Sequence, residues 1–258
     1  HYAINGGSVT SGSLPSDQLY NANTSITSIF GSVARTGYTF GGWRNGSTTI
    51  AAGGSFTIVQ DSVLTAIWTP IDYTISYDSD GGTTPPNSFT KQIGQSFEVG
   101  SAVSKPGYNF TGWKAGSTTV GAGATVVTGS SNISYTAQWS AKVYRISYDW
   151  NGGRGTAVSD VDYTFGTPAI TLPLVGDRVR DGYTFAGWVT TTGGTTLLTT
   201  PFATTSEVTL YARWTANTYT IVYDTSTVTS GTMADTSLTA GTAFSLRANA
   251  FARTGYSF

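Results

Sequence analysis

Few side chains in this 258-residue chain could carry acid–base or nucleophilic chemistry. It has no cysteine, which excludes thiol nucleophiles, disulfides and thiolate metal sites. Its one histidine is His1, whereas a hydrolase triad needs a nucleophile, a base and a group that orients the base. A Ser–Lys arrangement is the nucleophilic route that remains. We therefore expect a protein that is not an enzyme, with no catalytic residue and no cofactor.

Paired carboxylates are a second possible chemistry, because glycoside hydrolysis uses two of them. Four aspartates are concentrated in one stretch of the chain: Asp160, Asp162, Asp177 and Asp181. These four aspartates have no counterparts in the preceding stretch of similar sequence, residues 71–142. Acidic residues that flank turns usually bond to the backbone or to water, so we interpret these four as structural.

Calcium binding is suggested by closely spaced oxygen ligands, such as Asp78 with Asp80 in "YDSDGG" and Asp149 with Asn151 in "YDWNGG". No third or fourth carboxylate follows nearby, and no twelve-residue loop pattern is present. A turn is the better interpretation, and we predict no metal site.

The composition restricts the class of partner. Charged residues make up 10% of the chain and the formal net charge is −1, which argues against nucleic acid and anionic membrane surfaces. No run of about 18 apolar residues is present to span a bilayer, so we predict no membrane insertion within this segment. Hydrophobic residues (39%) and 32 glycines favour short strands joined by many turns.

The chain repeats itself with a period of about 70 residues. One aromatic phrase reads "GYTFGGW" at 37–43, "GYNFTGW" at 107–113 and "GYTFAGW" at 182–188, and "GYSF" ends the chain. An opening phrase starts at Tyr73, Tyr144 and Tyr219 ("YTISYDSDGG", "YRISYDWNGG", "YTIVYDTS"), and a closing phrase reads "LTAIW", "YTAQW" and "LYARW". Three phrases in a fixed order indicate tandem modules, each long enough to be a small domain.

These phrases divide the chain into modules at 1–70, 71–142, 143–217 and 218–258. The first module lacks part of its opening strand and the fourth lacks its C-terminal part, so we expect the native protein to extend beyond both ends. The linkers at 69–72, 140–143 and 215–218 are only a few residues long, which favours an elongated rod over loosely tethered domains.

Within each module the periodicity is two, which predicts strands with one buried face and little or no helix. Tyr73, Ile75 and Tyr77 alternate with polar residues, as do the matching residues of later modules. In the aromatic phrase the tryptophan falls an odd number of residues after the phenylalanine. The glycine before it, for example Gly112, is expected to mark a bulge that returns the ring to the same face.

Six of the seven tryptophans fall into two columns of this repeat, where they could stack on glycans or fill cores. Burying one removes about 150–250 Å² from water, and at about 25 cal/mol per Å² two represent about 10 kcal/mol as an upper bound. A small module without disulfide or metal needs that stabilisation. We therefore predict as core residues Trp43, Trp68, Trp113, Trp139, Trp188 and Trp214, with Tyr38, Phe40, Tyr108, Phe110, Tyr183 and Phe185.

Trp150 belongs to neither column and sits at a turn after Asp149. It is the best single candidate for an exposed contact with a partner. A cap on the hairpin or packing between modules are the alternatives.

The order Y-x-I-x-Y-D-x-x-G-G, G-Y-x-F-x-G-W, L-Y-A-x-W resembles the Listeria–Bacteroides repeat, also known from the B repeat of internalin B. The resemblance covers essentially the whole chain as three nearly complete copies and one truncated copy. It implies a β-grasp-like sheet and a place in the extracellular part of large bacterial surface proteins, where tandem copies serve as stalks or adhesive arms. The family offers no catalytic residue to transfer.

We therefore expect a non-catalytic stalk of a bacterial extracellular protein, on the cell surface or secreted, that projects or connects a functional region. One alternative is an adhesin module that binds a protein or glycan on a host or neighbouring cell. The other is a subunit of a self-assembling extracellular fibre or surface layer.

Overall fold

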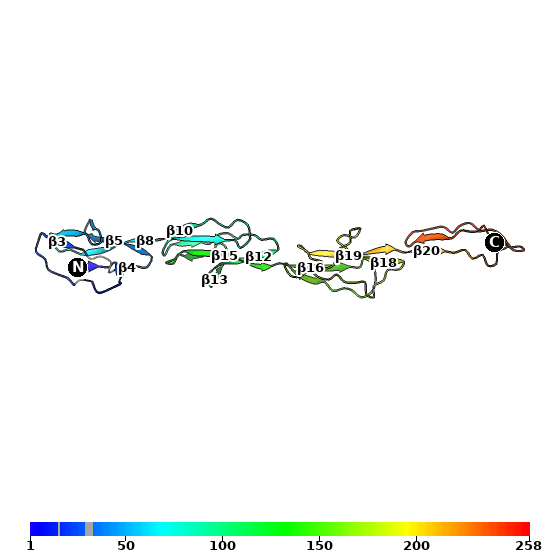
Figure 1. Cartoon of the computed structure of the whole chain (residues 1–258), viewed down its shortest axis with the longest axis horizontal. Helices are drawn as coiled ribbons and strands as arrows, with labels where there is room; N and C mark the ends of the chain where they lie inside the picture. Colours follow the sequence, from blue (N-terminus) through cyan, green and yellow to red (C-terminus); the bar gives the residue numbers. More distant parts are fainter. Residues whose placement is uncertain (15, 29–32) are drawn as a thin grey trace. The chain divides into compact units, whose positions relative to one another are not determined.

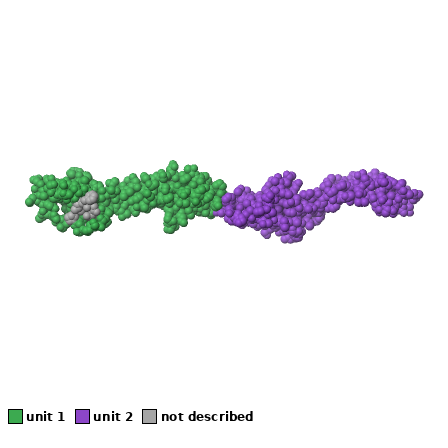
Figure 2. Space-filling view, in the orientation of Figure 1, with its two compact units in different colours: residues 1–140 green, residues 141–258 purple. Residues whose placement is uncertain are grey.

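The computed structural model describes residues 1–14, 16–28 and 33–258. Over these residues the chain forms short strands joined by turns, and no helix (Figure 1). The mainly β composition predicted from the two-residue periodicity is confirmed. The chain divides into two compact units, residues 1–140 and 141–258, coloured green and purple in Figure 2. The division falls inside the predicted linker at 140–143.

Within residues 1–14, 16–28 and 33–70 the strands form three small sheets. Four strands make the main sheet in the order β1-β8-β5-β6, and the pairs β2-β4 and β3-β7 make the other two. The strands are β1 (Tyr2–Ala3), β2 (Ser8–Val9), β3 (Thr24–Thr27), β4 (Val33–Ala34), β5 (Tyr38–Asn45), β6 (Thr48–Ile50), β7 (Ser55–Ile58) and β8 (Leu64–Pro70).

The next repeat has a five-stranded sheet in the order β10-β9-β15-β12-β13 and a two-stranded sheet, β11-β14. Its strands are β9 (Asp72–Asp78), β10 (Phe89–Gln92), β11 (Ser96–Glu98), β12 (Tyr108–Ala115), β13 (Thr118–Val120), β14 (Thr125–Val127) and β15 (Ile133–Ala141).

The second unit contains a four-stranded sheet, β17-β16-β19-β18, and a separate pair, β20-β21. Its strands are β16 (Val143–Asp149), β17 (Val161–Thr164), β18 (Tyr183–Val189), β19 (Val208–Ala216), β20 (Thr218–Ile221) and β21 (Thr236–Thr239). The opening, middle and closing phrases of the sequence thus each form a strand.

One arrangement recurs in the three larger sheets. The closing strand lies between the opening strand, which runs parallel to it, and the strand of the aromatic phrase, which is antiparallel to it in the first and third repeats. The parallel register pairs Tyr77 with Tyr135, and Tyr148 with Leu210. Because side chains alternate along each strand, this register places the large side chains of both strands on one face.

The bulge predicted at the glycine before the tryptophan is present. The register of β5 against β8 shifts between Phe40 and Gly42, and that of β18 against β19 shifts between Phe185 and Gly187. The shift adds a residue to the strand, so phenylalanine and tryptophan reach the same side of the sheet. Ring centroids of Phe40 and Trp43 lie 5.2 Å apart, at an edge-to-face angle.

Each of the first three repeats has its own hydrophobic core. The clusters centre on Trp43 with Leu64, on Trp113 with Ile75, and on Trp188 with Leu210. Each core is built from residues of a single repeat, so each repeat can bury its apolar face without a neighbour.

Candidate functional site

The tryptophans of the aromatic phrase are almost completely buried. Trp43 and Trp113 are 0% exposed and Trp188 is 2% exposed. The indole N–H of Trp113 donates to the carbonyl of Gly100 at 2.9 Å, and that of Trp188 donates to Pro173 at 2.7 Å. A tyrosine of the opening strand packs edge-on against each ring, at 4.8–5.1 Å between centroids. These rings therefore offer no face to a ligand.

The tryptophans of the closing strand hold the turn that follows the opening strand. Their indole N–H groups donate at 2.8–3.2 Å to the carbonyl of the residue just before the Asn-Gly-Gly or Asp-Gly-Gly sequence. The three pairs are Trp68 with Ile4, Trp139 with Ser79, and Trp214 with Trp150. Trp214 is 8% exposed and the other two are half-buried.

The second glycine of that turn makes room for the closing tryptophan. A Cβ added at Gly82 would lie 2.7 Å from Cζ2 of Trp139, and one at Gly153 would lie 2.5 Å from the same atom of Trp214. Gly7 repeats the contact in the first module, at 2.4 Å from Trp68. Because these approaches are closer than any real side chain allows, the glycine pair in the sequence is explained by the indole ring.

A basic residue also contacts the turn that follows the opening strand. The sequence analysis did not predict this contact. In all four copies a basic residue stands three positions before the tyrosine of the aromatic phrase and lies over its ring, at 4.0–5.0 Å from the centroid. The residues are Arg35, Lys105, Arg180 and Arg253. The first three also donate to the carbonyl of Asn5, Asp80 and Asn151 in the turn, at 2.8–3.4 Å. The charge fixes the turn against the start of the aromatic strand.

The remaining core residues predicted from the phrase lie where the rings meet. Tyr38, Phe40, Tyr108, Phe110, Tyr183 and Phe185 are all half-buried. The three phenylalanines each pack between the two tryptophans of their own repeat, at 5.2–5.7 Å between centroids. The three tyrosines lie under the cations.

Trp150 is half-buried and packs on the core of the third repeat. Its ring centroid lies 4.8 Å from that of Trp188 and 5.9 Å from that of Phe185. Its indole N–H is buried without a hydrogen-bond partner among the described residues. Ile4 and Ser79 occupy the equivalent position in the first two repeats, so the third repeat gains an additional ring here.

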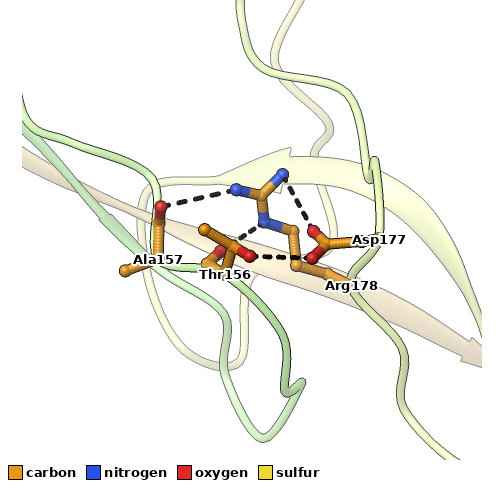
Figure 3. Close-up of polar contacts among 4 residues, drawn as sticks. All are labelled: Thr156, Ala157, Asp177 and Arg178. Atoms are coloured by element: carbon orange, nitrogen blue, oxygen red, sulfur yellow. Dashed lines mark hydrogen bonds and ion pairs between the residues drawn. The ribbon is translucent and has the colours of Figure 1, made fainter.

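The Trp150 ring packs against an arginine that the first two repeats lack. Arg178 stands where the first two repeats bury Val33 and Val103, and its guanidinium lies 4.8 Å from the centre of the Trp150 ring. Its side chain is only 14% exposed. Figure 3 shows how it is held: Nε donates to the carbonyl of Thr156 at 2.7 Å and Nη2 to that of Ala157 at 3.4 Å.

The four aspartates considered for glycoside chemistry each contact a side chain of the third repeat. Asp160 accepts a hydrogen bond from Nε of Arg145 at 2.9 Å, and Asp162 forms an ion pair with Nη1 of the same arginine at 3.7 Å. The pKa of the Asp160 carboxyl is lowered, mainly by the Arg145 hydrogen bond. Asp177 accepts from the hydroxyl of Thr156 at 2.8 Å, which lowers its pKa too, and Asp181 pairs with Arg154.

The residues considered for calcium build turns. A carboxylate oxygen of Asp78 accepts the backbone N–H of Asp80 at 2.9 Å, and one of Asp149 accepts that of Asn151 at 2.7 Å. This is the Asx-turn geometry expected of aspartate before a tight turn. Across residues 1–14, 16–28 and 33–258, no three His, Cys, Asp or Glu residues gather as a metal site would require.

The single histidine lies beside a hollow of about 590 Å³ in the first repeat. Nδ1 of His1 is 3.0 Å from a carboxylate oxygen of Asp17, and both side chains are largely exposed. Ser62 lines the same hollow, but its hydroxyl donates to Gln60 at 2.9 Å and accepts from Asn45 at 3.2 Å. A nucleophile directed at the imidazole is what a triad would need, and these bonds direct Ser62 elsewhere.

Comparison with known proteins identifies relatives that are considerably longer than this chain. Two proteins of Evansella cellulosilytica are similar to this chain. One, named "Putative Gly-rich membrane protein", is 28% identical over 204 residues, which is 73% of this chain and 22% of the relative. The other, named "Putative membrane protein", is 30% identical over 177 residues, 65% of this chain and 25% of the relative. The chain thus spans about a quarter of the length of the relatives it matches.

Among residues 1–14, 16–28 and 33–258, no helix is long and apolar enough to cross a membrane. The family comparison accounts for most of the sequence. The profile of the Listeria-Bacteroides repeat domain matches three successive segments, residues 1–67, 73–138 and 144–213, and no catalytic domain is indicated. Each segment contains the tryptophan of one aromatic phrase, one glycine turn and the basic residue that contacts this turn, and it ends just before the closing tryptophan of that repeat. The chain belongs to the Listeria-Bacteroides repeat domain family.

Proposed function

We propose that this chain is a non-catalytic stalk segment of a bacterial extracellular protein, in which β-grasp-like modules follow one another and hold a functional region away from the surface. The observation that carries the proposal is the self-sufficiency of the repeat. Each of the first three copies buries its own pair of tryptophans and fastens its own turn through an indole N–H and a cation. Such a unit can be added in series without changing its neighbours.

The chemistry of the side chains supports a mechanical role over a reactive one. The aromatic rings that would serve a glycan site are packed against one another. The four clustered aspartates are engaged by arginine and threonine side chains. The membrane-protein names of the two relatives support a place outside the cytoplasm on or near the cell envelope.

Small-angle X-ray scattering of the purified chain tests the proposal. The chain is compared with a variant from which residues 71–142, one whole repeat, are deleted. A stalk predicts that the maximum dimension falls by about one module length in the variant. A compact particle whose maximum dimension hardly changes would contradict it.

Binding assays address the adhesin alternative, and electron microscopy addresses the self-assembling alternative. A glycan array and a panel of surface proteins are probed with the intact chain, and negative-stain microscopy examines the same sample for polymers. Neither ligand nor polymer is expected. Saturable binding would contradict the stalk and favour an adhesin. Regular filaments would contradict it and favour a fibre or surface-layer subunit.

A further inference from the structure

The glycine that opens the aromatic phrase contacts the following repeat. In the first unit a Cβ placed on Gly37 would lie 2.4 Å from Cδ1 of Ile93 and 2.9 Å from its Cβ. Ile93 belongs to the next repeat, in the turn between β10 and β11. Gly37 is buried and Ile93 is half-buried. The isoleucine therefore occupies the space that a side chain at position 37 would need.

The second unit repeats the contact between its own two repeats. A Cβ placed on Gly182 would lie 2.7 Å from the Cβ of Ala240. Ala240 directly follows β21, as Ile93 directly follows β10. The same turn approaches Tyr183 as well, because a Cβ on Gly241 would lie 2.4 Å from the tyrosine hydroxyl. The two junctions use equivalent positions although their sequences differ.

The carbonyl of the same glycine holds the linker. The carbonyl oxygen of Gly37 accepts the backbone N–H of Ile71 at 2.9 Å, and that of Gly182 accepts Asn217 at 2.8 Å. Asn217 also accepts the backbone N–H of Ala240 at 2.9 Å, and its side chain accepts the hydroxyl of Thr184 at 2.6 Å. In the second unit, one linker residue is thus bonded to the repeat before it and to the repeat after it.

Conformation and contact can be separated in this chain. Gly37, Gly182 and Gly255 have φ angles of +81°, +80° and +85°, so a side chain is strained at all three positions. A Cβ on Gly255 would meet nothing within 4 Å, whereas the other two positions are filled by the next repeat. Gly255 therefore reports the cost of the backbone conformation alone.

We propose that the opening glycine of the aromatic phrase, at Gly37 and at Gly182, is a docking site for the next repeat. It receives the small or aliphatic residue that directly follows the second strand of that repeat, and its carbonyl fixes the linker. Bending between the two repeats would force the seated side chain into the glycine backbone or remove it from contact. The contact and the linker together form a joint between the two repeats. This joint restricts the direction of bending as well as the length of the linker. Its biological use rests on the proposed stalk function, but the joint itself does not.

Spin labels measure the joint directly, because the chain has no native cysteine to interfere. Ser47→Cys and Ser117→Cys place one label on an exposed hairpin tip of each of the first two repeats. A narrow distance distribution between the labels is expected in the intact chain. Gly37→Ala should broaden or shift it, while Gly255→Ala should leave it unchanged. Ile93→Ala, which leaves the glycine untouched, should broaden it too.

A double variant tests the pairing of the two residues. Gly37→Ala with Ile93→Ala relieves the collision and should narrow the distribution relative to Gly37→Ala alone. Tryptophan fluorescence of each variant checks that both repeats stay folded. Distributions that stay the same in Gly37→Ala and in Ile93→Ala would overturn the proposal, as would an equal change in Gly255→Ala. A compact particle in scattering together with a narrow label distance would reject the stalk and retain the joint.

Discussion

At Gly82 the absence of a single methyl group decides how the closing tryptophan meets the turn. Gly82→Ala would place a Cβ 2.7 Å from the Trp139 ring and 3.0 Å from the carbonyl oxygen of Ser104. We expect a loss of about 1–3 kcal/mol in the free energy of unfolding of this repeat, typical of overpacking. Chemical denaturation followed by tryptophan fluorescence measures it.

The control for that substitution lies in the same repeat. A Cβ on Gly121 meets nothing within 4 Å, and its φ is not in the left-handed region. Gly121→Ala should leave the unfolding curve nearly unchanged or stabilise it slightly. Equal losses for the two alanines would show that the indole contact does not decide the residue at position 82.

The Asp160 carboxylate has a depressed pKa, and its largest cause is the hydrogen bond from Arg145. Arg145 lowers it by a hydrogen bond at 2.9 Å, so Arg145→Gln should raise the pKa of Asp160 toward its ordinary value. Because the folded-state pKa is below the unfolded one, the associated stabilisation is present above about pH 4 and is lost as the pH falls through the folded pKa. Carboxyl ¹³C shifts against pH measure both effects. An unmoved titration midpoint would mean that Arg145 is not the cause.

At the scale of elements, Arg178 connects two loops of the third repeat. Arg178→Val introduces the residue type of the other repeats but removes the bonds to Thr156 and Ala157. The Arg154–Val179 bridge, with both N–H···O distances at 2.9 Å, should then open more often. We expect faster amide hydrogen exchange at these two residues, measured by NMR.

Arg145→Val provides the comparison, because Arg145 is an exposed arginine of the same repeat that pairs with Asp160 on another edge. It should leave exchange at Arg154 and Val179 unchanged. If both variants accelerated amide exchange equally, the repeat would be loosened in general. The bonds of Arg178 would then not be what holds the Arg154–Val179 bridge closed.

Much of the element order follows from local pattern. Alternation predicted the opening, middle and closing strands, and the odd spacing from Phe110 to Trp113 predicted the bulge that is observed at the equivalent Gly42 and Gly187. These features depend on residues only a few positions apart. The division into four modules and the exposed role considered for Trp150 stay predictions, although its ring packs against Trp188.

Other features depend on residues that are distant in sequence. The parallel pairing of β9 with β15 joins residues 58 positions apart, as Ile75 with Ile133, and periodicity carries no information about the partner. The cation before the aromatic phrase was visible as a column of the repeat, from Arg35 to Arg253. It was missed because its role depends on a turn carbonyl about thirty residues earlier, as in the Arg180–Asn151 bond.

At the scale of the whole molecule, separate cores predict separate unfolding. Trp113→Ala removes a fully buried ring and its bond to Gly100, and should cost the second repeat about 3–5 kcal/mol. The first and third repeats keep their own cores. Thermal unfolding should therefore show one transition shifted downward while the others stay in place.

The milder Trp113→Phe substitution keeps a ring in the core and should shift the same transition by less. Residue-specific NMR signals assign each transition to its repeat. A single transition that moves as a whole would show that the repeats unfold as one cooperative body. An unchanged melting curve would contradict the assignment of Trp113 to the core.

The parallel pairing of opening and closing strands determines how a module responds to a pulling force. The chain enters a repeat at the start of the opening strand and leaves it at the end of the closing strand. In two parallel neighbours these points lie at opposite ends of the ladder. Tension along the chain then loads all the hydrogen bonds between β9 and β15, or between β16 and β19, together in shear, and cannot peel them apart one at a time.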